Sequence, residues 1–330
     1  MTATTPRPLA ELPKAHLHVH LEGAMRPSTL FELCARQGDP VPTIATSYSD
    51  FAAFQKLYVT ARGAIRYEDD LVRLVGEVVQ DAATDGALWI EPAIHLAGHR
   101  PLGPEIAVLE LLLEAGRQAS AATGVGVGWL IATDRTLSPE LALEQAILAT
   151  RYTGDGVVSF GLANDEAAAA PEAFAPAFAR AREAGLISAP HAGEHGGPDS
   201  VRGALDALGA DRVQHGVRSI EDSALVARLA DEQVCLDVCP TSNVSLSVVP
   251  GFDAHPLPLL LDAGVACSIN ADDPLLFGVG LLDEYTVCRQ QFGLDDTALA
   301  ACARASVHHS GAPADLKARA LGGIDDWLRS

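Results

Sequence analysis

The sequence of 330 residues has no long apolar run and few basic residues. Its apolar stretches are short and interrupted by charge or glycine, far below the roughly 20 residues that span a bilayer. Lysine and arginine total 23 against 43 aspartates and glutamates, which gives a formal net charge of -20. A surface of this sign repels phosphate backbones and anionic lipid, so we expect no nucleic acid and no membrane as partners.

Signals for export and for disulfide stabilisation are also missing. The first 13 residues hold three prolines and no apolar segment of the kind that secretory signals carry. The six cysteines are scattered, and Cys235 and Cys239 have no second pair with which to form a structural zinc site. We therefore expect reduced cysteines, mostly packed in the interior of a cytoplasmic protein.

No linker, low-complexity tract or short-period repeat divides the chain, so we expect one domain over residues 1–330. Short apolar runs, typical of strands buried on both faces, alternate with segments of helical spacing. Eight such runs can be marked: Ala15–His20, Leu88–Ile94, Gly126–Thr133, Val157–Leu162, Leu186–His191, Arg212–Val217, Val234–Cys239 and Ala266–Ile269. The clearest helical segments are Ala107–Ala122, Pro139–Tyr152, Pro171–Ala184, Ser200–Leu208 and Glu221–Asp231.

Eight strand–helix units predict an α/β fold, a single (β/α)8 TIM barrel. The alternative, an open doubly wound sheet, usually carries Gly-x-Gly-x-x-Gly after its first strand, and that fingerprint is absent here. The apolar helical stretch Ser47–Thr84 is longer than an ordinary strand–helix connection, which predicts inserted helices after strand 1, over the barrel mouth. Residues after about Gly280 should form the last barrel helix and a C-terminal helical tail.

Polar residues gather at the predicted C-terminal ends of particular strands. In a barrel these ends meet on one face, where active sites lie. The residues are His18 and His20 at strand one, His191 at strand five, His215 at strand six, and Asp272 and Asp273 after strand eight.

Each of these signals has an ordinary structural reading when taken alone. A His-x-His pair can be incidental, a buried histidine can pair with backbone, and an aspartate can cap a turn. Glu194, three residues after His191, can be a solvated loop carboxylate. His16 extends the alternation of the first strand, but we place it nearer the barrel bottom and do not expect it to be a ligand.

Together the signals favour a metal site. Residues two apart on a strand point to the same side, so His18 and His20 can reach one ion. The adjacent carboxylates Asp272 and Asp273 would repel unless a cation or a proton lay between them. Three histidines and one aspartate suit Zn²⁺ and leave one position for water, whose pKa zinc lowers towards neutrality.

Five segments then carry a resemblance to a known family, in order and over nearly the whole chain. They are Leu12–Gly23 (LPKAHLHVHLEG), His191–Glu194 (HAGE), His215–Gly216 (HG), Cys239–Asn243 (CPTSN) and Ser268–Pro274 (SINADDP). The sequence resembles the adenosine deaminase family of the metal-dependent amidohydrolase superfamily. The resemblance implies a (β/α)8 barrel with one zinc ion per chain.

The resemblance also implies a role for each matching residue. The zinc ligands it implies are His18, His20, His191 and Asp272. Glu194 matches the proton donor to purine N1, His215 the residue that orients and deprotonates the attacking water, and Asp273 the carboxyl that bonds N7. In Gly161–Glu166 a backbone N–H matches the group that meets N3. The residues expected to face the substrate are His20, Glu22, Asn164 and Asp273.

Two positions depart from the family pattern, and both lie at the sugar end of the expected site. Asn164 stands where the family commonly has glycine, which narrows the pocket. Glu22 stands where many adenosine deaminases have an aspartate that touches the ribose. We expect Glu22 to face the sugar side of the pocket and to set the preference among purines.

The function expected from this resemblance is hydrolytic deamination of the 6-amino group of a purine, adenosine to inosine plus ammonia. The alternatives are adenine and a 5'-modified adenosine such as aminodeoxyfutalosine, and more remotely a purine-binding protein without catalysis. A two-metal hydrolase needs a bridging lysine or carboxylate after strand four, where Gly161–Ala163 offers none. The zinc deaminases that combine H-x-E with P-C-x-x-C are excluded, because P-C-x-x-C does not occur. The oligomeric state is left open.

Overall fold

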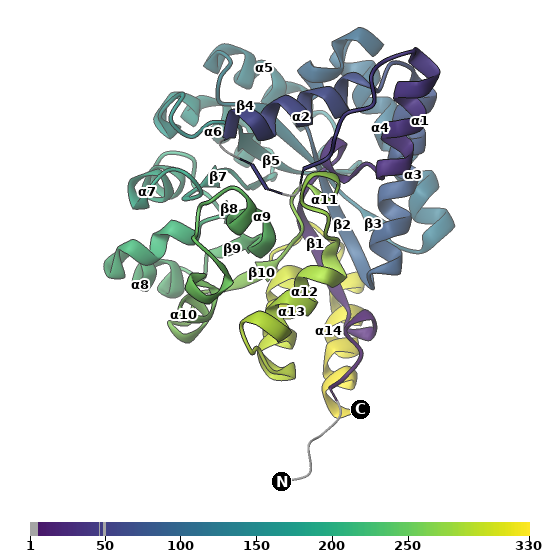
Figure 1. Cartoon of the computed structure of the whole chain (residues 1–330). Coiled ribbons are helices and arrows are strands. Elements are labelled where there is room, and N and C mark those ends of the chain that lie inside the picture. Colours follow the sequence, from purple (N-terminus) through teal and green to yellow (C-terminus); the bar gives the residue numbers. More distant parts are fainter. Residues whose placement is uncertain (1–5, 46, 49–50) are drawn as a thin grey trace.

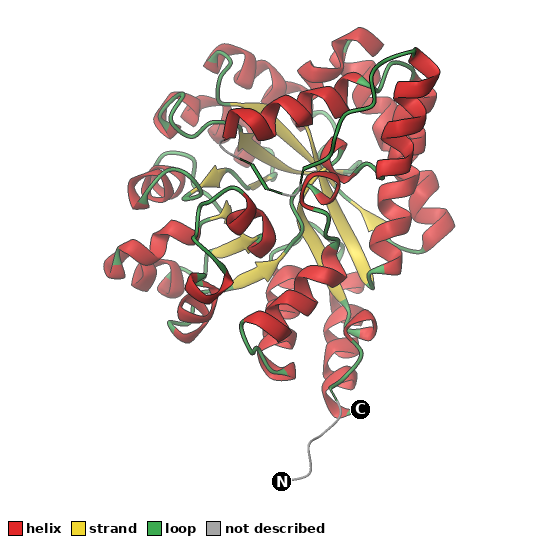
Figure 2. Cartoon of the chain, in the orientation of Figure 1, coloured by secondary structure: helices red, strands yellow, loops and turns green. Residues whose placement is uncertain are grey.

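The computed structural model describes residues 6–45, 47–48 and 51–330. Parallel strands form a central wall, and helices surround it on the outside (Figures 1 and 2). The strands are β1 Lys14–His20, β2 Ala87–Ile94, β3 Gly126–Val127, β4 Trp129–Asp134, β5 Val157–Ala163, β6 Ile187–Ser188, β7 His191–Ala192, β8 Arg212–His215, β9 Cys235–Val238 and β10 Cys267–Ile269.

The strand order follows the chain in two parallel sheets, β1-β2-β4-β5-β6, with β3 also on β2, and β7-β8-β9-β10. The two sheets meet between β6 and β7, which are two parts of the predicted fifth strand. Pro190 interrupts that strand because proline has no N–H to donate to a ladder. At the other edge, His20 N donates to Asp272 O (2.9 Å) and Asp272 N to His18 O (3.0 Å).

Through these two junctions the two sheets form the predicted (β/α)8 barrel. The predicted third strand is divided into β3 and β4. The helices that follow the strands are α4 Glu105–Thr123, α5 Pro139–Thr150, α6 Ala175–Glu183, α7 Pro198–Asp206, α8 Ser223–Asp231, α9 Pro240–Ser245, α10 Leu257–Asp262, α11 Pro274–Phe277 and α12 Leu281–Gln291. The predicted helix Pro171–Ala184 is instead a 3₁₀ turn, Pro171–Phe174, followed by α6, because Pro176 fits only the first turn of a helix.

Inserted helices follow strand 1, as predicted. They are α1 Pro27–Gln37, α2 Phe51–Gly63 and α3 Glu68–Thr84. The insertion thus begins with α1, before the predicted stretch Ser47–Thr84, and residues 49–50 of that stretch lie outside the described residues. In Figure 1, α2 lies across the ends of β4 and β5, where it covers the barrel mouth.

The chain ends in the predicted helical tail, α13 Asp296–His308 and α14 Ala314–Arg329. In Figure 1, α14 lies beside the start of β1. All six cysteines are buried free thiols, as expected. Among the helices of the described residues, none has the length and apolar character needed to cross a membrane.

The barrel interior contains a buried ion cluster below the strand ends. The guanidinium of Arg212 pairs with Glu91 and lies 3.3 Å from Asp237, and all three side chains are fully buried. Trp89 Nε1 also donates to Glu91 (2.9 Å), and Ser268 Oγ donates to Asp237 (2.7 Å). Removal of one partner from such a cluster leaves an uncompensated buried charge.

Arg212→Met should therefore lower the free energy of unfolding by about 3–5 kcal/mol. Equilibrium denaturant unfolding measures this change. Arg319, whose pairing with Asp315 is exposed, offers the matched control. Arg319→Met should leave the unfolding curve nearly unchanged, and equal effects of the two substitutions would contradict the structural importance of the cluster.

Candidate metal centre and active site

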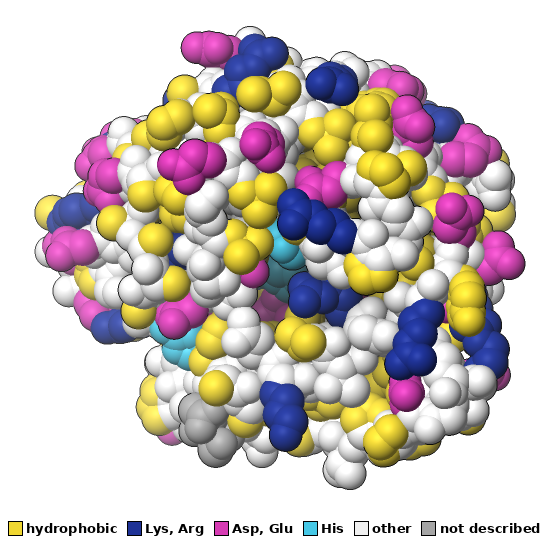
Figure 3. Space-filling view, turned by 90° about the horizontal axis from the view of Figure 1, so that it is seen from above, with side chains coloured by type: hydrophobic (Ala, Val, Ile, Leu, Met, Phe, Trp, Pro, Cys, Tyr) yellow, Lys and Arg dark blue, Asp and Glu magenta, His cyan; other side chains and the backbone are white. Residues whose placement is uncertain are grey.

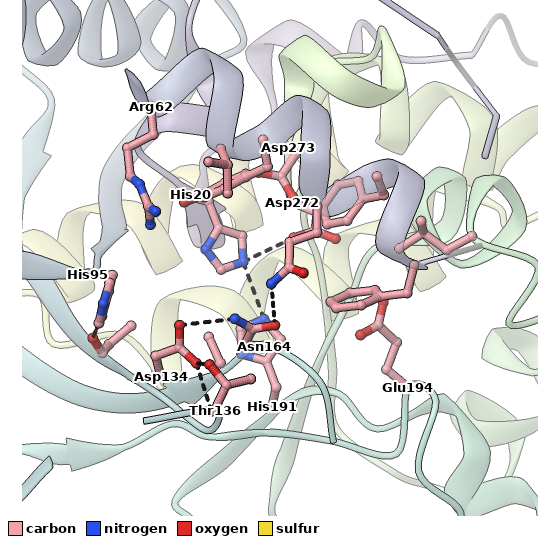
Figure 4. Close-up of a pocket in the computed structure, with 18 of the residues that line it drawn as sticks. His20, Arg62, His95, Asp134, Thr136, Asn164, His191, Glu194, Asp272 and Asp273 are labelled. Atoms are coloured by element: carbon pink, nitrogen blue, oxygen red, sulfur yellow. Dashed lines mark hydrogen bonds and ion pairs between the residues drawn. The ribbon is translucent and has the colours of Figure 1, made fainter. Parts of the chain in front are cut away.

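Three histidines and an aspartate, carried by β1, by β7 and by the segment after β10, converge at one point of the barrel mouth. Figure 4 shows His20, His191 and Asp272 of this group. Nε2 of His191 lies 3.2 Å from Nε2 of His18 and 3.3 Å from Nε2 of His20. Oδ1 of Asp272 lies 3.2 Å and 3.3 Å from the same two atoms of His18 and His20. Four predicted ligand atoms are therefore mutual neighbours.

The tautomers of two of these rings show that the group fits a cation. Nδ1 of His18 faces the carbonyl oxygen of Asp237 (3.0 Å), and Nδ1 of His191 faces that of Leu162 (3.1 Å). Each Nδ1 therefore carries the proton, and the two Nε2 lone pairs face each other. Lone pairs at 3.2 Å repel unless a positive ion lies between them.

The distances between the ligand atoms also fit a metal ion. Tetrahedral sites with metal–nitrogen bonds of 2.0–2.1 Å place their ligand atoms about 3.3 Å apart, which matches the separations of 3.2–3.3 Å. Burial lowers the pKa of His191 well below its ordinary value, and this keeps the ring neutral, as a ligand must be. Burial alone would raise the pKa of Asp272, but His18 and His20 hold it well below its usual range.

Two further titratable side chains border this group. Nε2 of His215 lies 3.9 Å from Oδ2 of Asp272 and 3.6 Å from Oε1 of Glu194. Burial, and then the negative charges of Asp272 and Glu166, raise the pKa of Glu194 well above its ordinary value. The raised pKa favours the protonated form of Glu194, beside the ligand group.

The turn that carries Glu194 is fixed by a carboxylate that sequence reasoning had not singled out. The Glu166 side chain accepts hydrogen bonds from the backbone N–H groups of Gly193 (2.9 Å), Glu194 (2.8 Å) and Gly196 (3.0 Å), and from the Ser200 hydroxyl. Ser242, also not singled out, donates to Asp272 (2.7 Å). In the sequence, the only signal for Glu166 and Ser242 was that each lies in a segment that resembles the family.

Asp273 faces the cleft with a free carboxyl oxygen. Burial, and then the charges of Asp272 and Glu22, raise the pKa of Asp273 well above its ordinary value. Among the described residues, its Oδ1 has no hydrogen-bond partner. A Cβ on Gly23 would lie 1.6 Å from this Oδ1, so the position of Asp273 depends on a glycine at residue 23.

Three site residues hold the left-handed backbone conformation that non-glycine residues rarely adopt. The φ angles are 64° at His215, 59° at Asp272 and 77° at Asn164. Asparagine tolerates this region better than other side chains, which accounts for its presence where the family commonly has glycine. At His215 and Asp272 the conformation costs on the order of 1–3 kcal/mol each, and such strain concentrates at functional sites.

The structure differs from the sequence expectation at Glu22. Its side chain is fully buried, and its oxygens accept hydrogen bonds from His99 (2.6 Å) and Tyr58 (2.9 Å). Burial alone would raise its pKa, but the bond from His99 outweighs this and lowers the pKa to about 2. Glu22 follows Leu21, whose backbone is helical (φ -56°, ψ -49°), so strand alternation no longer sets its direction.

Asn164 does lie at the cleft, as expected, but its side chain is already engaged. Nδ2 donates to Asp134 (3.0 Å), and Oδ1 accepts from Gln55 of α2 (2.9 Å) and from the N–H of Asp165 (2.8 Å). Asn164 thereby connects the inserted helix to the barrel wall. The other predicted site residues are brought together in one place.

A cleft that opens to solvent contains this site. Figure 3, which looks down on this face, shows histidine and acidic side chains at the bottom of a hollow. The metal-binding end is lined by His20, His191, His215, Glu194, Asp272 and Asp273. Away from it the walls come from α2 and the strand ends, with Phe51, Phe54, Gln55, Tyr58, Arg62, His95, Asp134, Thr136 and Asn164.

A parallel barrel whose strand ends present histidines and an aspartate spaced for a metal ion is the architecture of the metal-dependent amidohydrolases. Residues 13–327 match the family model described as adenosine deaminase. The chain belongs to the adenosine deaminase family, and it is a hydrolytic deaminase.

Several known proteins resemble the chain over most of its length. A Streptomyces virginiae protein, provisionally named adenosine/adenine deaminase, is 45% identical over 98% of both chains. An aminodeoxyfutalosine deaminase of Streptomyces coelicolor is 39% identical, over 98% of this chain and 87% of its own. An adenine deaminase of Chelativorans sp. is 39% identical, over 87% and 90% respectively.

Two solved structures share the fold. An adenine deaminase from Arthrobacter aurescens has 30% identity and a TM-score of 0.90, and covers 96% of this chain and 99% of its own. An amidohydrolase from Burkholderia ambifaria with bound zinc has 25% identity and a TM-score of 0.86, with 97% and 93% covered.

Gly23→Ala should displace Asp273 and lower kcat/KM by about 10²-fold, the loss typical of a misplacement of about 1 Å at a reacting site. Steady-state kinetics measures this. Gly76 of α3 is the control, because a Cβ there would meet nothing within 4 Å. Gly76→Ala should keep full activity, and normal activity of Gly23→Ala would show that Asp273 is not needed.

Proposed function

We propose that this deaminase removes the 6-amino group of an adenine-type purine, with adenosine as substrate and inosine and ammonia as products. The observation that supports this most strongly is the buried carboxyl of Glu194, with its raised pKa, beside the His/Asp ligand group in a cleft that continues to polar walls. Hydrolysis at C6 needs both a nucleophile and a proton for the ring, and these two features supply them.

We infer one zinc ion per chain, held by His18, His20, His191 and Asp272. With these four side chains as ligands, a water molecule would take a fifth coordination position, which zinc can accept. Zinc held there would lower the pKa of a water molecule towards neutrality and would so supply the nucleophile at neutral pH.

Glu194 is the proposed general acid. Attack at C6 removes the aromaticity of the ring, and a proton on N1 compensates for part of that cost. A carboxyl that stays protonated at neutral pH can supply this proton. The hydrogen bonds that Glu166 accepts from the surrounding turn hold Glu194 at the place where it acts.

His215 and Asp273 are the other proposed catalytic residues. His215 lies between Glu194 and Asp272, where the attacking water would meet its Nε2. Asp273, with its raised pKa and its free Oδ1, can donate a hydrogen bond to N7. His20 and Asn164 line the cleft and complete the proposed substrate contacts.

The extent of the cleft favours a nucleoside over a free base. Beyond the ligand group, its walls continue to Gln55, His95 and Asp134. In our proposal the purine base occupies the metal end and the ribose hydroxyls lie towards these groups. This part of the cleft is the proposed sugar site.

Adenine is the second candidate, and Glu22 is the observation that favours it. The carboxylate expected to bond the ribose is instead saturated by His99 and Tyr58 behind the cleft wall. The Arthrobacter aurescens adenine deaminase also shares the fold closely. In either case we propose that Glu22 influences substrate choice through the position of Tyr58, a residue of the cleft wall.

Glu194→Gln should retain the fold and the bound zinc but lose turnover by about 10²- to 10⁴-fold, towards the upper end, because an amide cannot protonate N1. Single-substrate kinetics and metal analysis on the same preparation measure both quantities. Activity within tenfold of the wild type would assign the ring proton to another residue.

The substrate assignment can be tested by the loss of the adenine absorption band with adenosine, adenine and aminodeoxyfutalosine. We expect kcat/KM for adenosine to exceed that for adenine by at least about tenfold, since adenine leaves the sugar site without its hydrogen bonds. The Glu194→Gln protein provides the blank. A higher kcat/KM for adenine would identify an adenine deaminase.

A further inference from the structure

A chain of hydrogen bonds runs from a helix backbone to His215. The N–H of Leu257, at the start of α10, donates to Nδ1 of His255 (3.1 Å). Nε2 of His255 lies 3.2 Å from Oδ1 of Asn243, and Nδ2 of Asn243 lies 3.2 Å from Nδ1 of His215. The three side chains are buried, with exposed fractions of 5%, 0% and 1%.

The backbone N–H at one end determines the direction of every bond in this chain. A backbone N–H can only donate, so Nδ1 of His255 must be unprotonated and its ring proton must lie on Nε2. Burial lowers the pKa of His255 to about 4, which agrees with a neutral ring. The Nε2–H of His255 therefore donates to Asn243, and only the carbonyl oxygen of that amide can accept it.

The amide nitrogen of Asn243 must then face His215. It donates to Nδ1 of His215, which therefore has no proton of its own. This excludes the imidazolium form, in which both ring nitrogens are donors. The ring proton of His215 is left on Nε2, the atom that lies 3.6 Å from Glu194 and 3.9 Å from Asp272.

The reverse arrangement is blocked at the far end of the chain. A flipped Asn243 would present its NH₂ group to Nε2 of His255, and His255 would then need its proton on Nδ1. That proton would point at the N–H of Leu257, and two buried donors would face each other without an acceptor. The ring of His255 is also held in place by stacking on Phe292 (5.1 Å between centroids).

We propose that Asn243 and His255 are positioning residues that hold His215 as the Nε2–H tautomer, so that His215 meets the attacking oxygen as a hydrogen-bond donor. The resemblance instead implied that His215 deprotonates the water. As a donor, His215 orients the oxygen so that a lone pair points at C6. That this oxygen belongs to the water that attacks a purine rests on the proposed function, whereas the tautomer of His215 does not.

The tautomer can be observed directly by NMR of the zinc-loaded protein with ¹⁵N-labelled histidine rings. The two-bond couplings to the ring protons distinguish a protonated from an unprotonated nitrogen, and the signal lost in His215→Gln identifies His215. We expect an unprotonated Nδ1 and a protonated Nε2. A protonated Nδ1 would overturn the proposal, whatever the activity of the enzyme.

Two substitutions then test whether the chain of bonds sets this state. His255→Asn keeps an oxygen that can accept from the N–H of Leu257, as an Asx turn does, but removes the donor to Asn243. Asn243→Asp has nearly the same size but can only accept from His215. In both variants we expect the ring proton of His215 to leave Nε2 for Nδ1 in part or in full.

Kinetics of the same variants separates positioning from a structural role. We expect kcat to fall by about 10²- to 10³-fold, the loss typical of one preorganised donor, with KM changed much less and zinc content retained. Unchanged kcat together with an unchanged His215 spectrum in both variants would overturn the proposal. Absence of turnover with every purine would contradict the proposed function alone, because the wild-type spectrum would still decide the tautomer.

Discussion

Two facing lone pairs are the constraint on which the site depends. The barrel brings Nε2 of His18 and Nε2 of His191 to 3.2 Å while backbone carbonyls keep the ring protons on the opposite nitrogens. The two lone pairs repel each other unless a cation lies between the rings. The carbonyl that fixes His18 belongs to Asp237, whose side chain takes part in the buried cluster with Arg212, so the barrel core also supports the metal centre.

The same fold maintains protonation states that would not persist in water. Burial near other carboxylates raises the pKa of Glu194 and of Asp273, while the histidines lower that of Asp272. Neighbouring carboxyl groups in one cleft thus have pKa values shifted in opposite directions, as the proposed roles of two proton donors and one metal ligand require. The left-handed backbone conformation of His215 and Asp272 turns both side chains into the cleft, and the surrounding hydrogen bonds offset its energetic cost.

Much of the fold and of the ligand group could be predicted because strand ends have a simple geometry. His18 and His20 share one side of a strand, and parallel strand ends meet on one face, so the cluster followed from spacing. The prediction that Glu22 faces the cleft was wrong because the chain leaves strand β1 before that residue. Glu22 lies in a 3₁₀ turn, and its partners Tyr58 and His99 come from distant segments that no local pattern connects to it. The role of Glu166 was missed for the same reason.

One metal ion at this cluster is the proposed basis of purine deamination by this chain. The most direct test is to remove metal with a chelator and titrate zinc back while following the loss of the adenosine absorption band. We expect negligible turnover without metal and a linear rise that ends at about one zinc per chain, the stoichiometry of a mononuclear catalytic site. Full turnover without metal, or a plateau only at two zinc ions per chain, would contradict it.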